Sequence, residues 1–315
     1  MQNNLKFLVT GGAGFIGSNI VKELLKQDYQ VRVVDNLSTG NIENIQTVMG
    51  QIEFFKGDLS ELSVARQALK DIDIVFHEAA VPSVQRSIAD PLSVNAANIN
   101  ATLNVLAAAR ESKIKKLVYA SSSSVYGNAK TLPKRETDPI DPISPYALTK
   151  FVGERYCQLF NKLYGLPTIC LRYFNVFGPS QNAASQYSAV IPKFITAILN
   201  GESPIVYGDG EQSRDFTYVD NVVSANILAA FSDADGEVVN IACNERITLN
   251  QIVETINKHQ GTTIAPNHAA EKPGDIKHSL ADISKAQKLI GYKPLVLFES
   301  GLQKTIEWYK LKLKK

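Results

Sequence analysis

Short, mainly apolar runs, each followed by a polar or helix-period segment, organise the first half of the chain. They lie at residues 7–9, 31–34, 52–56, 73–77 and 115–119. Runs of this kind, bounded by turn residues, are typical of strands buried on both faces of a parallel sheet. Because strands and helices alternate, the pattern predicts an α/β fold with a doubly wound parallel sheet.

The second half of the chain predicts a smaller lobe that is interleaved with the sheet. Strands are expected at residues 168–171 and 238–242, and the second of these returns to the large sheet. Between them, residues 204–210 and 213–219 are expected to pair as a small hairpin. We therefore expect residues 1–172 to form mainly one domain, joined by the strand near 238–242, and residues 173–315 to form mainly the lobe.

The composition adds few constraints beyond those of an ordinary globular protein. The chain has 315 residues, 44% hydrophobic and 20% charged, with a net charge of +2. This balance does not favour a nucleic-acid partner, and no apolar run is long enough to predict a membrane span. The first motif begins within ten residues of Met1, leaving no room for a signal peptide, so we expect a cytoplasmic protein. No metal site is predicted, and Cys157, Cys170 and Cys243 are interpreted as inert core residues.

Three glycines open the helix that follows the first strand. Gly11, Gly14 and Gly17 lie three residues apart, and the helix is expected to run to about Gln27. In this context they predict a Rossmann-type turn, whose bare backbone can approach a pyrophosphate at the helix N-terminus. Asp35 ends the second strand, where an acidic residue binds a ribose 2′-hydroxyl. It would repel a 2′-phosphate, and no Arg follows it directly, so the sequence predicts NAD rather than NADP.

Segments that follow the other strands are further candidates for cofactor contacts. The turn-rich loop 36–40 suits the adenosine, and Asp58 is either a partner of the adenine amino group or a helix cap. Small residues at 79–80 would let the cofactor lie on the backbone, whereas His77 is interpreted as structural. The expected contacts to NAD are Gly11, Gly14, Phe15, Ile16, Gly17, Asp35, Asn36, Ser38, Gly40, Asp58, Leu59, Ala79, Ala80, Tyr146, Lys150 and Tyr173.

Tyr146 and Lys150 lie four residues apart in a long helix predicted to start at Pro145, and therefore on one face of it. A tyrosine with its ordinary pKa of about 10 is a poor base at pH 7. A lysine ammonium one turn away, together with a cationic nicotinamide, is expected to lower that pKa. A hydroxyl from the serine run 121–124 would share the proton path. These residues predict proton abstraction beside a hydride acceptor.

The motifs Thr10-Gly-Gly-x-Gly-x-x-Gly17, Tyr146-x-x-x-Lys150 and Leu171-Arg-Tyr-Phe-Asn-Val-Phe-Gly178, with the serine run, resemble the extended short-chain dehydrogenase/reductase family. The resemblance covers essentially the whole chain. Within the family, the chain is most similar to the UDP-hexose 4-epimerases, and particularly to the UDP-N-acetylglucosamine 4-epimerase branch. The resemblance implies that Ser122, Tyr146 and Lys150 are the catalytic residues.

The resemblance also implies a mechanism. Tyr146 takes the proton of the sugar 4-hydroxyl while a hydride passes from C4 to NAD, and the 4-keto sugar rotates before the hydride returns to the opposite face. Related dehydratases and decarboxylases carry acidic residues where this chain has Ser123 and Ser124. Their absence favours simple epimerisation. In the N-acetylglucosamine branch, these serines are expected to contact the acetamide.

Further contacts to a UDP-sugar are expected in the second half of the chain. The resemblance implies that Asn175 lies at the diphosphate, and Arg214 is expected there because a guanidinium suits bidentate phosphate contact. The helix around Val190 is expected to cover the uracil. Lys272 stands where the family usually has an Arg on the diphosphate, and Asp275 is expected at the uridine ribose. The expected substrate contacts are Ser83, Ser122, Ser123, Ser124, Tyr146, Asn175, Val190, Arg214, Lys272, Asp275 and Ser279.

Ser279 occupies the position that gates the sugar pocket in this family, where a small residue admits an N-acetyl group. We therefore expect an NAD-dependent UDP-N-acetylglucosamine 4-epimerase. A UDP-glucose 4-epimerase, with dual specificity possible, is the first alternative. A UDP-uronic acid 4-epimerase would need a cation near the sugar C6, and a non-catalytic NAD-sensing scaffold would not need the base. Helices at 95–111 and 146–164 are candidates for a four-helix homodimer interface, as in the family.

Overall fold

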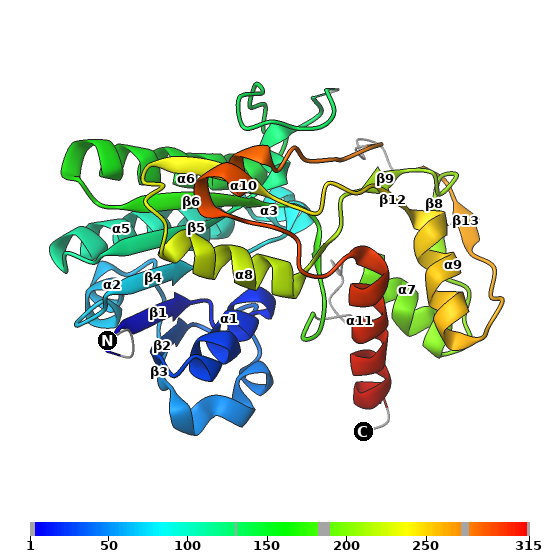
Figure 1. The fold of residues 1–315 in the computed structure, drawn as a ribbon, viewed down its shortest axis with the longest axis horizontal. Helices are drawn as coiled ribbons and strands as arrows, with labels where there is room; N and C mark the ends of the chain where they lie inside the picture. Colours follow the sequence, from blue (N-terminus) through cyan, green and yellow to red (C-terminus); the bar gives the residue numbers. More distant parts are fainter. Residues whose placement is uncertain (1–3, 130, 182–189, 272–276, 314–315) are drawn as a thin grey trace.

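In the described part of the chain, a seven-stranded parallel sheet forms the centre of the molecule (Figure 1). The structure, a computed structural model, describes residues 4–129, 131–181, 190–271 and 277–313. The strand order is β11-β6-β5-β4-β1-β2-β3. In chain order the strands are β1 (Lys6–Thr10), β2 (Gln30–Asp35), β3 (Glu53–Lys56), β4 (Ile74–His77), β5 (Lys116–Ser122), β6 (Thr168–Tyr173) and β11 (Glu237–Ile241).

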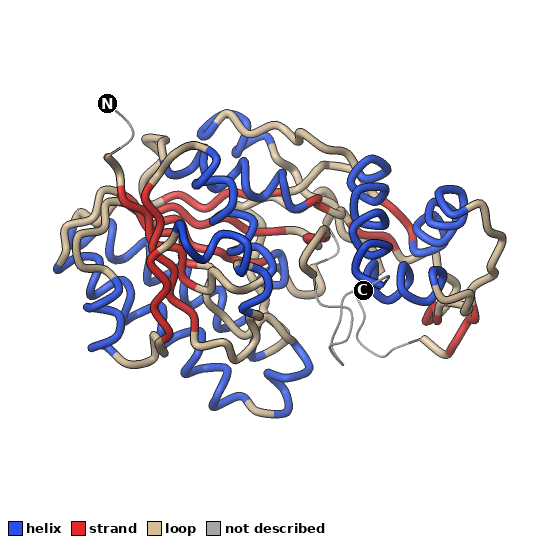
Figure 2. The backbone as a smooth tube through the Cα atoms, turned by 90° about the horizontal axis from the view of Figure 1, so that it is seen from below, coloured by secondary structure: helices blue, strands red, loops and turns tan. Residues whose placement is uncertain are grey.

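Helices cover both faces of this sheet (Figure 2). Phe7 and Val9 of β1 face one side, where α1, α8 and α10 pack, and Leu8 faces the other side, where α2, α5 and α6 pack. Each strand therefore buries both sets of side chains, which explains the apolar runs in the sequence. These helices are α1 (Phe15–Lys26), α2 (Leu62–Ala68), α5 (Ala101–Glu111), α6 (Pro145–Tyr164), α8 (Val219–Ala230) and α10 (Ser284–Ile290).

The strand order reverses between β1 and β4. From β1 the chain proceeds through β2 to β3, and it then returns to β4 on the other side of β1. Loops from the two halves diverge at this point and leave a crevice beyond the carboxyl ends of the strands. The doubly wound sheet predicted from the sequence is confirmed, and its reversal determines where a ligand can lie.

The smaller lobe lies beside one end of the sheet (Figure 1). Its apolar side chains, such as Ile195, Ile256 and Leu302, belong to the same core cluster as the α1 and α8 face of the sheet. The lobe and the sheet thus share one core. Its elements are α7 (Val190–Leu199), α9 (Leu249–Gln260), α11 (Phe298–Leu313), and the strands β8 (Ile205–Tyr207), β9 (Ser213–Arg214), β12 (Ile247–Thr248) and β13 (Asn267–Ala269).

The hairpin predicted over 204–210 and 213–219 is wrong. β8 pairs in parallel with β13, and β9 pairs antiparallel with β12. β10 (Thr217–Tyr218) pairs in parallel with β7 (Val176–Phe177). Gly208 and Gly210 both have positive φ, and the turns they form direct the chain away from β8. The local pattern identified extended segments, but their partners come from distant parts of the chain.

The helix expected over 95–111 is divided in the structure. α4 (Pro91–Asn95) leads into a π-helical turn, η3 (Ala96–Asn100), and then into α5. The short helix α3 (Val84–Ala89) precedes α4, and 3₁₀ turns η1 (Ile42–Asn44), η2 (Gln46–Gln51) and η4 (Ser123–Tyr126) follow β2 and β5. Pro145 begins α6 after the capping side chain of Ser144, as predicted.

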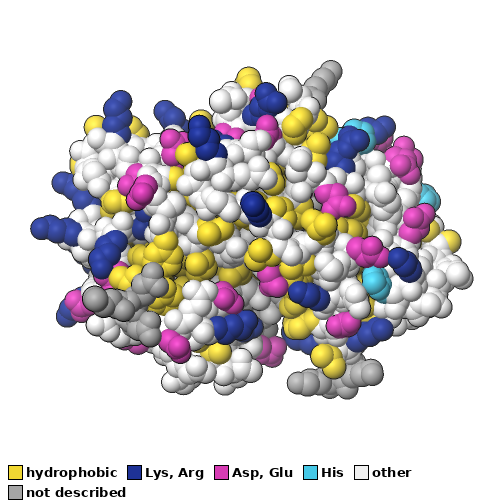
Figure 3. All heavy atoms as spheres, in the orientation of Figure 1, with side chains coloured by type: hydrophobic (Ala, Val, Ile, Leu, Met, Phe, Trp, Pro, Cys, Tyr) yellow, Lys and Arg dark blue, Asp and Glu magenta, His cyan; other side chains and the backbone are white. Residues whose placement is uncertain are grey.

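The surface carries charges of both signs. On the face shown in Figure 3, Lys and Arg side chains lie among Asp and Glu side chains rather than in one basic region. Among the helices described, none combines the length and the apolar character needed to cross a bilayer.

Candidate active site

A cavity of about 890 Å³ opens beyond the carboxyl ends of β1, β2, β4, β5 and β6. Its lining begins at the glycine turn after β1, passes the ends of the central strands, and reaches Arg214 and Ser279 in the smaller lobe. The cavity therefore extends from the central sheet to the smaller lobe. Its position is the crevice at which ligands of doubly wound sheets bind.

The glycine turn forms one wall of this cavity. Gly11 has a φ of +65°, and the Gly14 amide donates to the Gly11 carbonyl oxygen at 2.9 Å. A Cβ on Gly11 would lie 2.8 Å from the Ala79 backbone, and one on Gly17 would lie 2.4 Å from the Gly11 oxygen. Bare backbone is thus required here, as in a turn that receives a pyrophosphate at a helix N-terminus.

Asp35 and Asp58 line the same part of the cavity. The Asp35 carboxylate accepts hydrogen bonds from the amides of Ala13 at 3.0 Å and Leu37 at 2.7 Å, and burial raises its pKa. Asp58 accepts from the Ser60 amide and from Asn36 Nδ2. Glu61, and not Asp58, is the N-cap residue of α2. These carboxylates hold the two loops that border the expected adenosine site.

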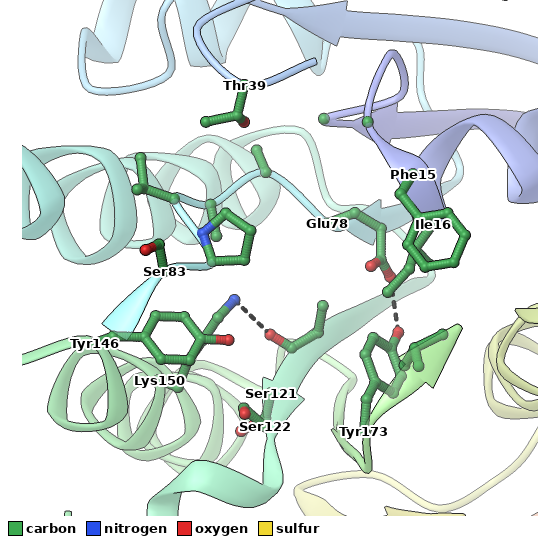
Figure 4. A pocket seen from close by; sticks show the side chains of 18 of the residues that line it. Phe15, Ile16, Thr39, Glu78, Ser83, Ser121, Ser122, Tyr146, Lys150 and Tyr173 are labelled. Carbon is green, nitrogen blue, oxygen red and sulfur yellow. Dashed lines mark hydrogen bonds between the residues drawn. The ribbon is translucent and has the colours of Figure 1, made fainter. Parts of the chain in front are cut away.

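Tyr146 and Lys150 reach the cavity from one face of α6, as their spacing predicted (Figure 4). Burial raises the pKa of Tyr146, while a hydrogen bond with the Ser122 side chain acts in the opposite direction. Among the protein groups, burial outweighs this hydrogen bond, and the negative charge of Glu78 adds to the rise. The lowering of this pKa by Lys150 together with a cationic nicotinamide stays a prediction.

The Lys150 ammonium is fully buried. Its Nζ donates to the carbonyl oxygen of Ala120 at 2.8 Å and lies over the Tyr119 ring, 5.2 Å from the centroid. Burial lowers the pKa of Lys150, and the negative charge of Glu78 counters this shift. The Lys150 ammonium is thus held at the end of β5, beside Tyr146.

The serines that end β5 have different surroundings. Ser121 donates to the buried Glu154 carboxylate at 2.5 Å, and Glu154 in turn pairs with Arg172 at 2.8 Å. Ser122 instead accepts from the Ser124 amide and meets Tyr146. This difference agrees with the choice of Ser122, rather than Ser121, as the catalytic serine. Arg172 lies within β6 and not after it, because the strand continues to Tyr173.

His77 has a structural environment. Its ring nitrogens meet the hydroxyls of Thr10 at 2.8 Å and Thr102 at 3.0 Å, and burial lowers its pKa to about 3. The three cysteines are free and buried. These observations agree with the sequence interpretation of both residue types.

The substrate end of the cavity contains most of the remaining predicted residues. Ser83 caps α3, and Asn175 adopts a φ of +33° and donates to the Asp215 carbonyl oxygen. Arg214 donates to the carbonyl oxygens of Ser213 and Lys277. The buried Ser124 hydroxyl has no hydrogen-bond partner among the described residues. The structure brings the following predicted substrate residues to the cavity: Ser83, Ser122, Ser123, Ser124, Tyr146, Asn175, Arg214 and Ser279.

Four predicted residues are not placed on this wall. Gly40 does not line the cavity, and a Cβ added to it would lie 2.9 Å from the Asp35 carboxylate. Val190 packs against the core. Lys272 and Asp275 lie outside the described residues. The expected roles of all four remain predictions.

The structure adds residues that the sequence interpretation missed. Glu78 lines the cavity with its carboxylate at the end of β4, and the 4%-exposed Lys134 lines it from the loop before α6. Arg86 and Tyr126 also line it. Glu78 could have been found from the sequence, because it directly follows a predicted strand. Lys134, Arg86 and Tyr126 reach the cavity only through tertiary folding.

The residues present fit NAD. Gly11, Gly14 and Gly17 leave room for a pyrophosphate, Asp35 borders the expected ribose site, and Lys150 and Tyr146 line the same cavity. Together, the parallel sheet, the glycine turn and the Ser122–Tyr146–Lys150 group define a Rossmann-type enzyme that acts through a dinucleotide.

Comparison with known proteins gives the family. The NAD dependent epimerase/dehydratase family matches residues 7–242, and the chain belongs to this family. NAD is accordingly its cofactor.

Individual relatives cover nearly the whole chain. A UDP-N-acetylglucosamine 4-epimerase from Methanobrevibacter ruminantium, solved with UDP-N-acetylmuramic acid, is 46% identical, with a TM-score of 0.94 and coverage of 98% of this chain and 99% of that one. A putative UDP-glucose 4-epimerase from Methanocaldococcus jannaschii is 38% identical over 96% of this chain and 98% of its own. A UDP-glucuronic acid 4-epimerase from Bacillus cereus is 34% identical, with a TM-score of 0.90 and coverage of 98% and 100%.

Proposed function

We propose that this enzyme is an NAD-dependent UDP-sugar 4-epimerase whose preferred pair is UDP-N-acetylglucosamine and UDP-N-acetylgalactosamine. The observation that carries the reaction is the Ser122–Tyr146–Lys150 group on one wall of a cavity that also contains the glycine turn. Names of relatives that cover nearly all of the chain support a UDP-sugar as substrate.

In this proposal, Tyr146 removes the proton of the 4-hydroxyl and Ser122 shares its hydrogen bond. Bound NAD would supply the hydride acceptor for C4 of the sugar, beside the Tyr146 and Lys150 side chains that line the cavity. The resulting 4-keto sugar rotates within the cavity, which exposes its opposite face. Tyr146 then gives back the same proton, so neither a proton nor a reducing equivalent is lost over the cycle.

The choice of an N-acetylated sugar rests on Ser279. This short side chain lines the cavity from the smaller lobe. Ser124 lines the same cavity, and its buried hydroxyl has no hydrogen-bond partner among the described residues. A small polar residue leaves volume for an acetamide, and an unpaired buried hydroxyl gains from a polar substituent. The 46% identity to the UDP-N-acetylglucosamine 4-epimerase supports the same choice.

A UDP-uronic acid is the second candidate substrate, and the structure gives a specific reason to test it. The alternative needs a cation near the sugar, and Lys134, which is 4% exposed, lines the cavity. Among the described residues, its Nζ donates to the Ala129 carbonyl oxygen. An ammonium can make three such bonds, so a substrate carboxylate has donors available.

The remaining proposals concern domains and assembly. We propose that residues 1–172 with β11 bind mainly NAD and that residues 173–315 bind mainly the UDP-sugar. We also propose a homodimer through α5 and α6. In support, Leu148, Leu159 and Leu163 leave 48%, 44% and 63% of their surface exposed on α6. A stripe of exposed leucines suits burial against a second helix pair.

An NMR time course of the purified enzyme with UDP-N-acetylglucosamine, UDP-glucose and UDP-glucuronic acid, each alone, tests this function. We expect the galacto epimer to form fastest from the first, and Tyr146→Phe to slow it by about 10²- to 10⁴-fold. Faster turnover of UDP-glucose or UDP-glucuronic acid would overturn the specificity. No epimer from any of the three would overturn the reaction, and a monomer in sedimentation at assay concentration would contradict the dimer.

A further inference from the structure

We propose that Glu78 is a positioning residue that balances the buried charge of Lys150 and favours the oxidised form of the bound cofactor. The proposal rests on the proposed function, because it assigns Glu78 a part in the hydride step of that reaction. It adds a fourth side chain to the Ser122–Tyr146–Lys150 group.

The carboxylate of Glu78 is held in one orientation. It follows β4 directly, lines the cavity, and accepts a hydrogen bond from the Tyr173 hydroxyl at 2.8 Å. That hydroxyl in turn accepts from Asn226 Nδ2 at 2.8 Å, and Asn226 is fixed to its own helix through the Val222 carbonyl oxygen. Figure 4 shows Glu78 and Tyr173 facing each other beside the cavity, with Tyr146 and Lys150 on the opposite helix. This series of hydrogen bonds, from α8 through Tyr173 to Glu78, therefore positions an acidic group at the place where we expect one end of the cofactor to lie.

The charged groups that act on this carboxylate come from the neighbouring elements. Tyr173 of β6 donates to it, and the Lys150 ammonium of α6 lies close enough to favour its ionised form, while burial raises its pKa. In return, the Glu78 charge raises the pKa of Lys150 and of Tyr146. Glu78 and Lys150 are thus two buried groups of opposite charge, and each favours the charged form of the other against the effect of burial.

A balance of charges shows what this pair does during the reaction. Before hydride transfer, the nicotinamide and Lys150 are positive, while the Tyr146 phenolate and Glu78 are negative. Afterwards, the nicotinamide and Tyr146 are neutral, and Lys150 still faces Glu78. The sum of these groups is zero in both states. Without Glu78 the buried site carries one uncompensated positive charge throughout, which opposes the cationic form of the cofactor most.

A second base is not needed in this reaction, because Tyr146 returns the proton that it takes. Glu78 therefore acts by charge and not by proton transfer. The energetic consequence is that replacing it by a neutral amide makes the bound cofactor easier to reduce. The same replacement removes the partner that keeps Lys150 protonated, so the alkaline limit of activity moves to lower pH.

The test compares Glu78→Gln with Glu78→Asp in the holoenzyme. The enzyme is poised at defined potentials with redox mediators, and the reduced fraction of its cofactor is read from absorbance at 340 nm. We expect Glu78→Gln to raise the ratio of NADH to NAD about tenfold at a given potential, and Glu78→Asp to restore most of the wild-type value. A ratio within twofold of wild type in Glu78→Gln would overturn the proposal.

Tyr173→Phe offers an independent check should Glu78→Gln fail to fold. It removes the hydroxyl that favours the ionised carboxylate but leaves the carboxylate in place. Compared with wild type at the same pH and potential, its ratio of NADH to NAD should be higher at pH 7 and should approach the wild-type value at pH 9, because a higher pH favours the ionised Glu78 carboxylate. A ratio equal to that of wild type at both pH values would count against the proposal. Because this readout needs no sugar, a failure of the epimerase function leaves it intact.

Discussion

The two ends of the active-site cavity are built in different ways. The cofactor end is formed by short, contiguous segments after β1, β2 and β4, and the glycine turn, Asp35 and Ala79 all lie within the first 80 residues. The substrate end joins the end of β5, the loop containing Lys134, Asn175 after β6, and Arg214 and Ser279 of the smaller lobe. Those segments are brought together only by the shared core of sheet and lobe.

Because of this difference, the two ends should tolerate different amino-acid substitutions. The cofactor end depends on backbone approach, in which one added methyl group collides with a carbonyl oxygen. The end expected to bind the substrate is lined by side chains from several elements. We therefore expect a substitution there to change which sugar fits and to leave the sheet unchanged. Substitutions should therefore separate NAD binding from sugar specificity.

Among the substitutions that should separate the two ends, Ser279→Tyr is expected to have the largest effect. An aromatic ring at this position fills the space proposed for the acetamide, and overpacking of about 3 kcal/mol corresponds to roughly a hundredfold. The ratio of kcat/KM for UDP-N-acetylglucosamine to that for UDP-glucose should fall by this factor, while bound NAD is unchanged. Equal loss for both sugars would show that Ser279 does not discriminate between them.

Gly17→Ala should act on the other end. The added Cβ would lie 2.4 Å from the Gly11 carbonyl oxygen, so the turn must shift. A strain of about 2 kcal/mol predicts roughly thirtyfold weaker NAD binding, measured by calorimetry. Gly50→Ala is the matched control, because its Cβ would meet nothing within 4 Å. If both variants bind NAD equally well, the glycine turn does not carry the cofactor.

His77 should make the cofactor end sensitive to acid. Its pKa is lowered to about 3 in the fold, so the unfolded chain binds the additional proton between that value and about 6.5. Stability should therefore fall as the pH drops, by roughly 2 kcal/mol from pH 7 to 5. The free energy of unfolding, measured with urea, should therefore fall by this amount less between pH 7 and pH 5 in His77→Gln than in wild type. The exposed His268→Gln is the control, and a slope equal to that of wild type in both variants would refute the assignment.

Arg214→Lys should give the smallest effect. It keeps the charge and loses the planar fork that binds a diphosphate through two bonds, which predicts about a tenfold rise in KM for the UDP-sugar. Bound NAD and the preference between sugars should not change. Arg66→Lys serves as the control, because Arg66 is exposed and pairs with Glu111, far along the chain. An unchanged KM would place the diphosphate elsewhere.

The sequence by itself determined the sheet, the glycine turn and the Tyr146–Lys150 pair. These features depend on local periodicity: strands buried on both faces are apolar throughout, and residues four apart share a helix face. The resemblance added Ser122, and the surroundings of Ser121 agree with that choice because Glu154 already binds Ser121.

Only the tertiary structure decided which distant segments meet. The pairing of β8 with β13 and of β9 with β12 replaced the predicted hairpin, since hydrogen-bonding partners of short strands are not encoded by their own alternation. The approach of Glu78 to Tyr173, and the presence of Lys134 at the cavity, depend on packing between elements far apart in the chain. Burial and neighbouring charge, which set the chemistry of those groups, exist only once that packing has formed.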